Sequence, residues 1–209
     1  MILAGDLPPG AQIREGQLAQ SCGVSRTPVR DALRRLESQA FVRRSESQRC
    51  FVADWSLDDI TDAFELRAML EGRASYRAAE RSSEDALQRL RHCNQQILQA
   101  ISKNSADVTG FLEGNREFHA IVLEMAASRR LTALLGTLIE QPVVWRTAHY
   151  YGRESLQRSY SEHEELLAAF ARRDGTWAKA IMEGHIHRAY HAYAEARLGL
   201  TAIDAQVGS

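Results

Sequence analysis

The chain has 209 residues with a formal net charge of −1, and 44% of them are hydrophobic, which is enough for one large or two small folded domains. No long apolar run suggests a membrane span, and three scattered cysteines argue against a disulfide-stabilised secreted domain. We therefore expect a cytoplasmic globular protein with no membrane partner. The charge is uneven, because residues 1–55 hold eight arginines against six acidic residues while the remainder is net acidic. A basic module on a mildly acidic body favours binding of nucleic acid at one surface.

Residues 23–37, GVSRTPVRDALRRLE, predict the turn and second helix of a helix-turn-helix. Thr27 can cap a helix, and Pro28 suits the first helical position because its missing N–H needs no partner there. Gly23 would form the turn after a first helix. Two separate faces follow at helical spacing. The apolar face is Val29, Ala32, Leu33 and Leu36, the basic face is Arg26, Arg30 and Arg34, and the first helix supplies Leu18, Ala19 and Val24.

An amphipathic surface helix with solvated arginines is the plain alternative. The surrounding sequence favours the helix-turn-helix, because residues 26–49 hold seven arginines against three acidic residues. Residues 42–52 then alternate as a short β-hairpin would. This order is typical of a winged helix-turn-helix domain, which we place at residues 1–55.

From about residue 56 the pattern becomes helical. Ser56 followed by Asp59 indicates a capping box that opens a long helix. Because no strand pattern follows, we predict an all-α helical bundle over residues 56–199 and a tail at 200–209. The fold class is therefore mainly α, with an N-terminal winged helix-turn-helix and a C-terminal bundle. Breaks that divide the bundle into six helices lie near Ser82, Ser105, Ser128, Gly152 and Gly175.

A charged pair interrupts the apolar face of the first bundle helix. Arg67 and Glu71 are four residues apart on the face that carries Ile60 and Phe64. Two interpretations stay open. The pair can neutralise itself and serve only packing, or Arg67 can border a cavity and offer its guanidinium fork to a carboxylate ligand.

Three histidines lie at the centres of apolar helix faces. His119 follows Asn115 by one turn, and His163 and His185 lie on two later helices. Each buried imidazole needs partners for two ring nitrogens. A single such histidine is more often a hydrogen-bonded core residue. Where three histidines converge, one divalent transition-metal ion can provide a partner for a ring nitrogen of each. Zn, Ni and Mn are the candidate metals.

The string GVSRTPVRDALRRLE, preceded by LPPGAQI and followed by a wing and by SLDDITDAFELRAMLEGRASYRAAE, resembles the GntR family of bacterial transcription regulators, FadR subfamily. The remaining residues are similar to the effector-binding domain of that subfamily, called FCD. The resemblance implies a homodimeric, metabolite-responsive protein that binds a double-stranded DNA operator, most commonly as a repressor. It also implies a truncated first helix, so we expect further residues upstream of Met1.

The second helix of the motif would enter the major groove with its N-terminal end. Arg26 and Arg30 can reach guanine edges or phosphates, and Arg34 lies further along as a backbone contact. Ser25 and Thr27 can bond phosphate oxygens. The resemblance matches Arg26, Thr27 and Arg30 to the family's contact positions.

The wing departs from the family pattern. Arg49 stands near the tip, where a glycine is usual, and Ala40 replaces another common glycine. The sequence therefore does not determine how this wing would insert into the minor groove. An arginine at a wing tip suits a narrow minor groove, so Arg49 is included among the DNA contacts.

The resemblance also bears on the histidines. Many FCD domains carry an Asp-x-x-x-His pair and two later histidines, and the matching positions here are Asn115, His119, His163 and His185. Asn115 is a departure, because a neutral amide is a weaker metal ligand than a carboxylate. The site would then keep one more positive charge and depend more on an anionic effector.

The resulting hypothesis is a regulator whose operator binding is controlled by a small organic acid, a carboxylate metabolite bound at the metal. The acid would change how the two bundles of a dimer sit, and so the spacing of the two recognition helices. A metal-dependent enzyme, a metal-ion sensor and a pocket that binds its ligand without metal stay open as alternatives. We expect no enzyme, because no nucleophile motif or general base accompanies the histidines. The candidate effector contacts are Arg67, Trp145, Arg146 and Tyr150.

Overall fold

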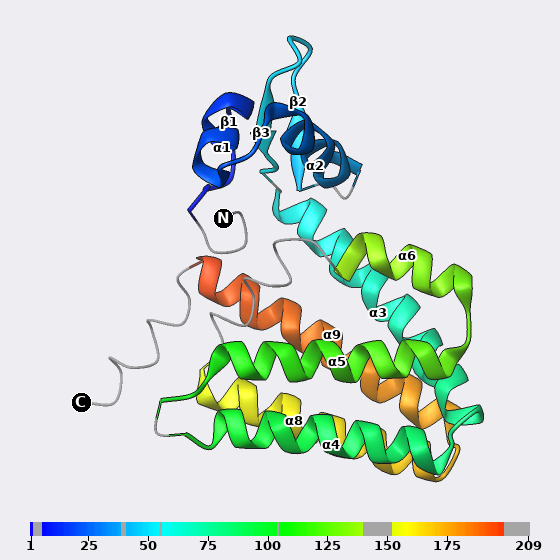
Figure 1. Ribbon diagram of the computed structural model, residues 1–209. Coiled ribbons are helices and arrows are strands. Elements are labelled where there is room, and N and C mark those ends of the chain that lie inside the picture. The colour runs from blue at the N-terminus through cyan, green and yellow to red at the C-terminus, as the bar shows by residue number, and fades with distance from the viewer. Residues whose placement is uncertain (2–5, 39–40, 55, 104, 140–151, 199–209) are drawn as a thin grey trace.

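The computed structural model describes residues 1, 6–38, 41–54, 56–103, 105–139 and 152–198 (Figure 1). These residues form a small N-terminal module of two helices and a three-stranded sheet, followed by a larger helical bundle. The module lies beyond the N-terminal end of α3 (Leu57–Glu80), the long helix that leads into the bundle (Figure 1). The predicted mainly α fold class is confirmed.

The N-terminal module consists of β1 (Gln12–Ile13), α1 (Glu15–Cys22), α2 (Arg26–Ser38), β2 (Val42–Arg44) and β3 (Cys50–Val52). Its antiparallel sheet has the strand order β1-β3-β2, so β2 and β3 form the hairpin of the predicted wing. Gly23 joins the two helices with φ of 66°, a left-handed conformation that glycine adopts without steric cost. The core of the module is Ile13, Ala19, Val29, Leu33, Phe41, Val42, Cys50 and Val52.

Three details of the predicted helix-turn-helix are wrong. Helix α2 begins at Arg26 rather than after a cap at Thr27, which makes Pro28 the third helical residue. The missing N–H of this proline still costs little, because the first four N–H groups of a helix have no partner within it. Ala32 and Val24 were expected on the apolar faces but are exposed. The buried part of the helix surface is narrower than the apolar pattern of the sequence indicated.

The bundle contains α3, α4 (Glu84–Ile101), α5 (Val108–Ala126), α6 (Arg129–Ile139), α8 (Arg153–Ala171) and α9 (Gly175–Leu198). These are six helices within the described residues. The ends of α3, α4 and α5 and the starts of α8 and α9 lie near the predicted breaks, whereas α6 ends at Ile139, well before the break predicted near Gly152. The predicted capping box is confirmed, because the Ser56 hydroxyl accepts from the Asp59 N–H while the Asp59 carboxylate accepts from the Ser56 N–H. Ser83 and Asp107 cap α4 and α5 in a similar way.

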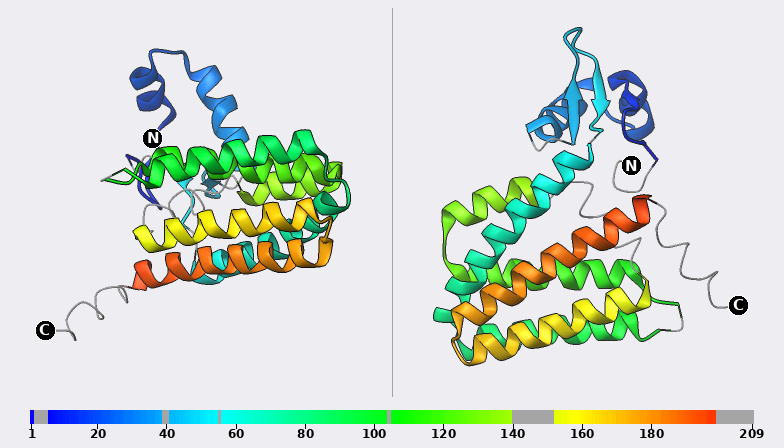
Figure 2. Two further views of the ribbon diagram at one scale, coloured as in Figure 1. Left: turned by 90° about the horizontal axis from the view of Figure 1, so that it is seen from below. Right: turned by 180° about the vertical axis from the view of Figure 1, so that it is seen from behind.

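The bundle helices enclose one main core. Helix α3 packs along α9, α5 lies against α3 and α4, and α8 lies against α4 and α9, whereas α6 contacts α3 (Figure 2). The approach of α9 to α3 is close at Gly72, where a Cβ would lie 2.7 Å from Glu183 Cγ. Phe64, Phe118 and Phe170 fill the core, and the candidate histidines project into it.

None of the helices in the described part of the chain is both long enough and apolar enough to cross a bilayer. Cys22, Cys50 and Cys93 are all free thiols.

Candidate metal centre and nucleic-acid interface

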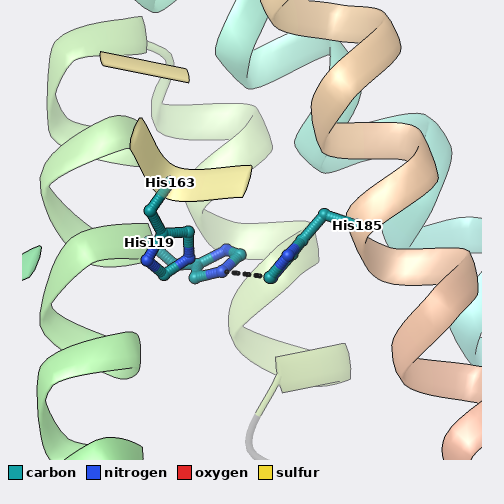
Figure 3. Close-up of side chains that lie close together, drawn as sticks. All are labelled: His119, His163 and His185. Atoms are coloured by element: carbon teal, nitrogen blue, oxygen red, sulfur yellow. Dashed lines mark hydrogen bonds between the residues drawn. The ribbon is translucent and has the colours of Figure 1, made fainter. Parts of the chain in front are cut away.

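His119 of α5, His163 of α8 and His185 of α9 converge in the bundle core (Figure 3). One ring nitrogen from each lies within 4.8 Å of the others, and the three residues are 8%, 0% and 6% exposed. Each helix delivers its histidine because the imidazole sits in the middle of an inward apolar face. The predicted convergence is confirmed, and within the described ranges no other group of metal-ligating side chains comes together in this way.

The Nδ1 atom of each histidine bonds to a polar residue on another helix. The pairs are His119 with the Glu71 carboxylate of α3, His185 with Glu162 Oε2 of α8 at 2.7 Å, and His163 with Asn94 Oδ1 of α4 at 3.3 Å. The centre therefore joins side chains from α3, α4, α5, α8 and α9.

The Nε2 atoms face one another instead. Nε2 of His119 lies 3.3 Å from Nε2 of His185, and Nε2 of His163 is buried with no hydrogen-bond partner among the described residues. Phe118 stacks on the His163 ring with 3.9 Å between the centroids and covers that face of the imidazole. A buried ring nitrogen without a partner costs free energy. A transition metal ion coordinated by three imidazoles would remove this cost, so the residues present fit such an ion.

Burial and charge set the protonation of the centre. Burial lowers the pKa of His163 well below its usual range, and the neighbouring imidazoles lower it further. Burial also lowers the pKa of His185, although Glu162 partly opposes this effect. Burial raises the pKa of Glu71, but the Arg67 guanidinium and the bonded imidazole outweigh it and lower that pKa to about 2. The lowered pKa values of His163 and His185 favour their neutral forms, and that of Glu71 favours its ionised carboxylate.

A small cavity of about 10 Å³ lies beside the centre, between α3, α5 and α6. This volume holds about one water molecule. A ligand the size of an organic acid therefore requires the lining side chains or α6 to move. The lining residues are Glu71, Ala74, His119, Val122, Leu123 and Leu135.

The other predicted ligand contacts are placed only in part. Arg67 is buried, and its Nε and Nη2 atoms lie 2.9 and 2.8 Å from Glu71 Oε1, which is the ion pair that one of the two open interpretations expected. Asn115 is partly buried, one turn before His119. Three further effector candidates lie outside the described residues: Trp145, Arg146 and Tyr150.

Two histidine partners, Glu162 and Asn94, were not among the residues predicted from the sequence. Asn94 lies four residues after Leu90 and three before Ile97, so it interrupts an apolar helix face. Glu162 precedes Leu166 by four residues and shares its inward face. A lone polar residue on an apolar face was the available signal. It could not identify the histidine partners, because periodicity indicates the buried face but not the neighbouring helix.

The N-terminal part of α2 presents the predicted DNA contacts to solvent. Arg30 is bound by Glu15 of α1 at 3.2 Å, and Arg34 lies 3.6 Å from Asp31. Arg26 has no ion pair among the described residues, and its guanidinium lies over Gly16, where a Cβ would be 3.5 Å from Nη2. The exposed candidates are Ser25, Arg26, Thr27, Arg30, Arg34 and, in the wing loop, Arg49.

The wing loop tolerates Arg49 without strain at that position. The left-handed residue of the loop is Gln48, with φ of 60°, and the Arg49 N–H donates to Ser45 Oγ at 3.2 Å. The side chain of Arg49 remains exposed. Ala40, the other departure from the family pattern, lies outside the described residues.

Glu15→Gln is expected to tighten binding to non-specific duplex DNA several-fold at low salt. The Glu15 carboxylate now holds Arg30 through two bonds of 3.2 and 3.3 Å, and DNA phosphates must displace it. Release of the arginine adds one phosphate contact, which steepens the salt dependence by roughly 0.9 in log K against log salt. Fluorescence anisotropy over a salt series measures both quantities. The control is Glu84→Gln, the same charge change on the bundle, which should leave the DNA affinity and its salt dependence unchanged. If Glu15→Gln also binds DNA as the wild type does, the ion pair of Glu15 with Arg30 lies away from the DNA.

Comparison with known proteins bears on both parts of the chain. Residues 62–188 match the family model described as the FCD domain, and residues 1–52 match the model described as bacterial regulatory proteins, gntR family. The first match alone covers more than half of the chain.

Several relatives are similar over most of their length. The chain is 27% identical over 210 residues to the HTH-type transcriptional regulator LutR of Bacillus subtilis, covering 89% of this chain and 93% of LutR. It is 26% identical over 180 residues to the Nta operon transcriptional regulator of Aminobacter aminovorans, and the match covers 86% of this chain and 83% of that regulator.

Solved structures share the fold. E. coli McbR/YncC superposes with a TM-score of 0.74 at 24% identity, covering 92% of each chain. A GntR family member from Pseudomonas syringae has a TM-score of 0.56 at 27% identity, covering 96% of this chain and 83% of that one.

Proposed function

Because the chain belongs to the GntR family of bacterial transcription regulators and carries an FCD effector-binding domain, we propose that it is a cytoplasmic, homodimeric repressor controlled by a small organic acid at a transition-metal site. Its relatives and domains are those of a DNA-binding regulator and not of an enzyme. The finer proposal rests mainly on one observation. The buried Nε2 atom of His163 lies beside two other histidines and has no hydrogen-bond partner in the described part of the chain.

The metal ligands in this proposal are His119, His163 and His185, with Asn115 as a weak fourth ligand. A bound divalent ion supplies a Lewis-acidic position for a carboxylate oxygen. Imidazole nitrogens favour zinc or nickel over manganese, which prefers oxygen ligands.

Charge supports an anionic effector. The ion pair of Arg67 with Glu71 and that of Arg188 with Glu162 are each neutral. Neutral imidazoles leave the two positive charges of the ion uncompensated in a buried site. A small carboxylate, or better a dicarboxylate, would balance them. Further contacts are proposed for Arg67 and for Trp145, Arg146 and Tyr150.

In this proposal, helix α3 connects the effector site to the DNA-binding module. This helix carries Glu71, which bonds to His119, and its N-terminal end follows the wing directly (Figure 1). An effector that shifts α3 would change the spacing of the two recognition helices of a dimer and weaken operator binding. A sensor for the ion itself is less favoured, because no cysteine joins the described metal-ligand cluster.

The test is operator binding by metal-loaded and metal-free protein, with a duplex selected by the protein from a random pool. A panel of mono-, di- and hydroxy-carboxylic acids is expected to contain one that weakens binding of the loaded protein about 5- to 150-fold. That acid should have no effect on metal-free protein. If the acid weakens operator binding equally in the loaded and the metal-free protein, metal-assisted binding of the acid is contradicted. If zinc alone releases the operator DNA, the ion sensor is favoured.

A further inference from the structure

We infer that Glu71, Asn94 and Glu162 are positioning residues that hold the three imidazoles with the proton on Nδ1, so that a metal can bind only through Nε2. The inference deepens the proposed function and rests on the metal site proposed there. Its evidence is the hydrogen-bond pattern around the histidines, whose three rings are drawn in Figure 3.

The two carboxylate partners determine the tautomers of His119 and His185. An ionised carboxylate has no proton to donate, so the ring nitrogen that faces it must be the donor. Glu71 is fixed by Arg67, and Glu162 by Arg188. Neither carboxylate can turn away without leaving an arginine unpaired. Nδ1 therefore carries the proton in both rings.

The amide of Asn94 determines the tautomer of His163. Its Nδ2 donates to Glu164 Oε1 at 2.5 Å and faces the Tyr160 carbonyl oxygen at 3.4 Å, both of which can only accept. This fixes the amide so that Oδ1, an acceptor, faces His163 Nδ1. The His163 proton is therefore also on Nδ1.

Three Nε2 lone pairs then converge with no donor among them. One proton shared between His119 and His185, whose Nε2 atoms are 3.3 Å apart, can satisfy two of these atoms. It leaves His163 Nε2 without a partner. A metal ion satisfies all three at once, so the tautomers prepare the site before the ion arrives.

The three positioning residues are not equivalent. A carboxylate partner raises the basicity of an imidazole ligand, and a neutral amide does so less. His119 and His185 are therefore the stronger ligands, and His163 is the weaker one. Loss of a carboxylate partner should lower metal affinity by about 10- to 100-fold.

The direct test uses metal-free protein. Long-range ¹H–¹⁵N spectra of ¹⁵N-histidine-labelled chain, recorded at about pH 8 to keep imidazoles neutral, should show Nδ1–H tautomers at His163 and His185. Glu162→Met removes the acceptor and should convert His185 alone to the Nε2–H form. An Nε2–H tautomer at His163 or His185 in the wild type would overturn the inference.

The second measurement is zinc affinity by competition with a chromophoric chelator. Glu162→Gln, which leaves Arg188 free to be solvated, should lose about 10- to 100-fold, and the Co²⁺ absorption spectrum should still report three nitrogen ligands. The matched control is Glu165→Gln, an exposed residue of the same helix, which should bind as the wild type does. Equal affinities for the Glu162 variant and the wild type would overturn the positioning role. The expected tautomers without any metal binding would instead overturn the proposed metal site and leave the tautomer assignment standing.

Discussion

Removal of the metal with a chelator is expected to lower the midpoint of thermal unfolding by about 8–16 °C. An ion present at a thousand times its Kd stabilises the folded chain by about 4 kcal/mol, and each kcal/mol shifts the midpoint by about 2–4 °C in a protein of this size. The expected effect is large because an ion at the proposed site would join side chains from three helices of one core. Circular dichroism melts with and without added zinc measure it.

His163→Ala should abolish this zinc-dependent shift. Comparison within each variant separates the loss of metal from the cavity that the substitution creates, because the cavity is present in both melts. His187→Ala, an exposed change on the same helix as His185, should retain the full shift. A zinc-dependent shift in His163→Ala equal to that of the wild type would place the ion elsewhere.

Arg26→Ala is expected to weaken operator binding roughly 30-fold or more. A bidentate arginine–guanine contact contributes about 1–3 kcal/mol, and a dimer loses it in both half-sites. Arg26 is the strongest candidate because it is exposed and without an ion pair in the described part of α2. Anisotropy titrations with the selected duplex measure the loss.

Base contact and phosphate contact give different patterns for this variant. A base contact relaxes specificity at one position of each half-site, whereas a phosphate contact weakens all sequences equally and reduces the salt dependence. Arg35→Ala, also exposed but near the C-terminal end of α2, is the matched control and should bind nearly as the wild type does. A larger loss for Arg35→Ala than for Arg26→Ala would reverse the predicted orientation of α2 on DNA.

Much of the fold could be predicted from the sequence because its signals are local. Ser56 with Asp59, and the breaks near Ser82, Ser128 and Gly175, mark helix ends through side chains that satisfy or interrupt the backbone. The start of α2 was missed by two residues, since Pro28 is compatible with several positions in the first turn. Such errors concern the ends of an element and not its presence.

The candidate site could be predicted only in part. Helical periodicity predicted that three histidines face the core, and they converge there. It could not pair Glu162 with His185 or Asn94 with His163, because these contacts depend on which helices become neighbours. The proposed fourth ligand, Asn115, stays a prediction, as do the effector contacts at residues 145–150.

The placement of His185 on the last helix, α9, also orders events while the chain is being made. The N-terminal module is complete at Val52, but the histidine cluster cannot form until α9 has been synthesised. At about 5–20 residues per second, the roughly 130 residues in between take on the order of 10 s. A nascent chain therefore holds a complete winged helix-turn-helix module before the proposed effector site exists. If the protein is the dimeric repressor proposed above and stable operator binding needs two modules joined through the bundle, the unfinished chain would not repress a gene prematurely.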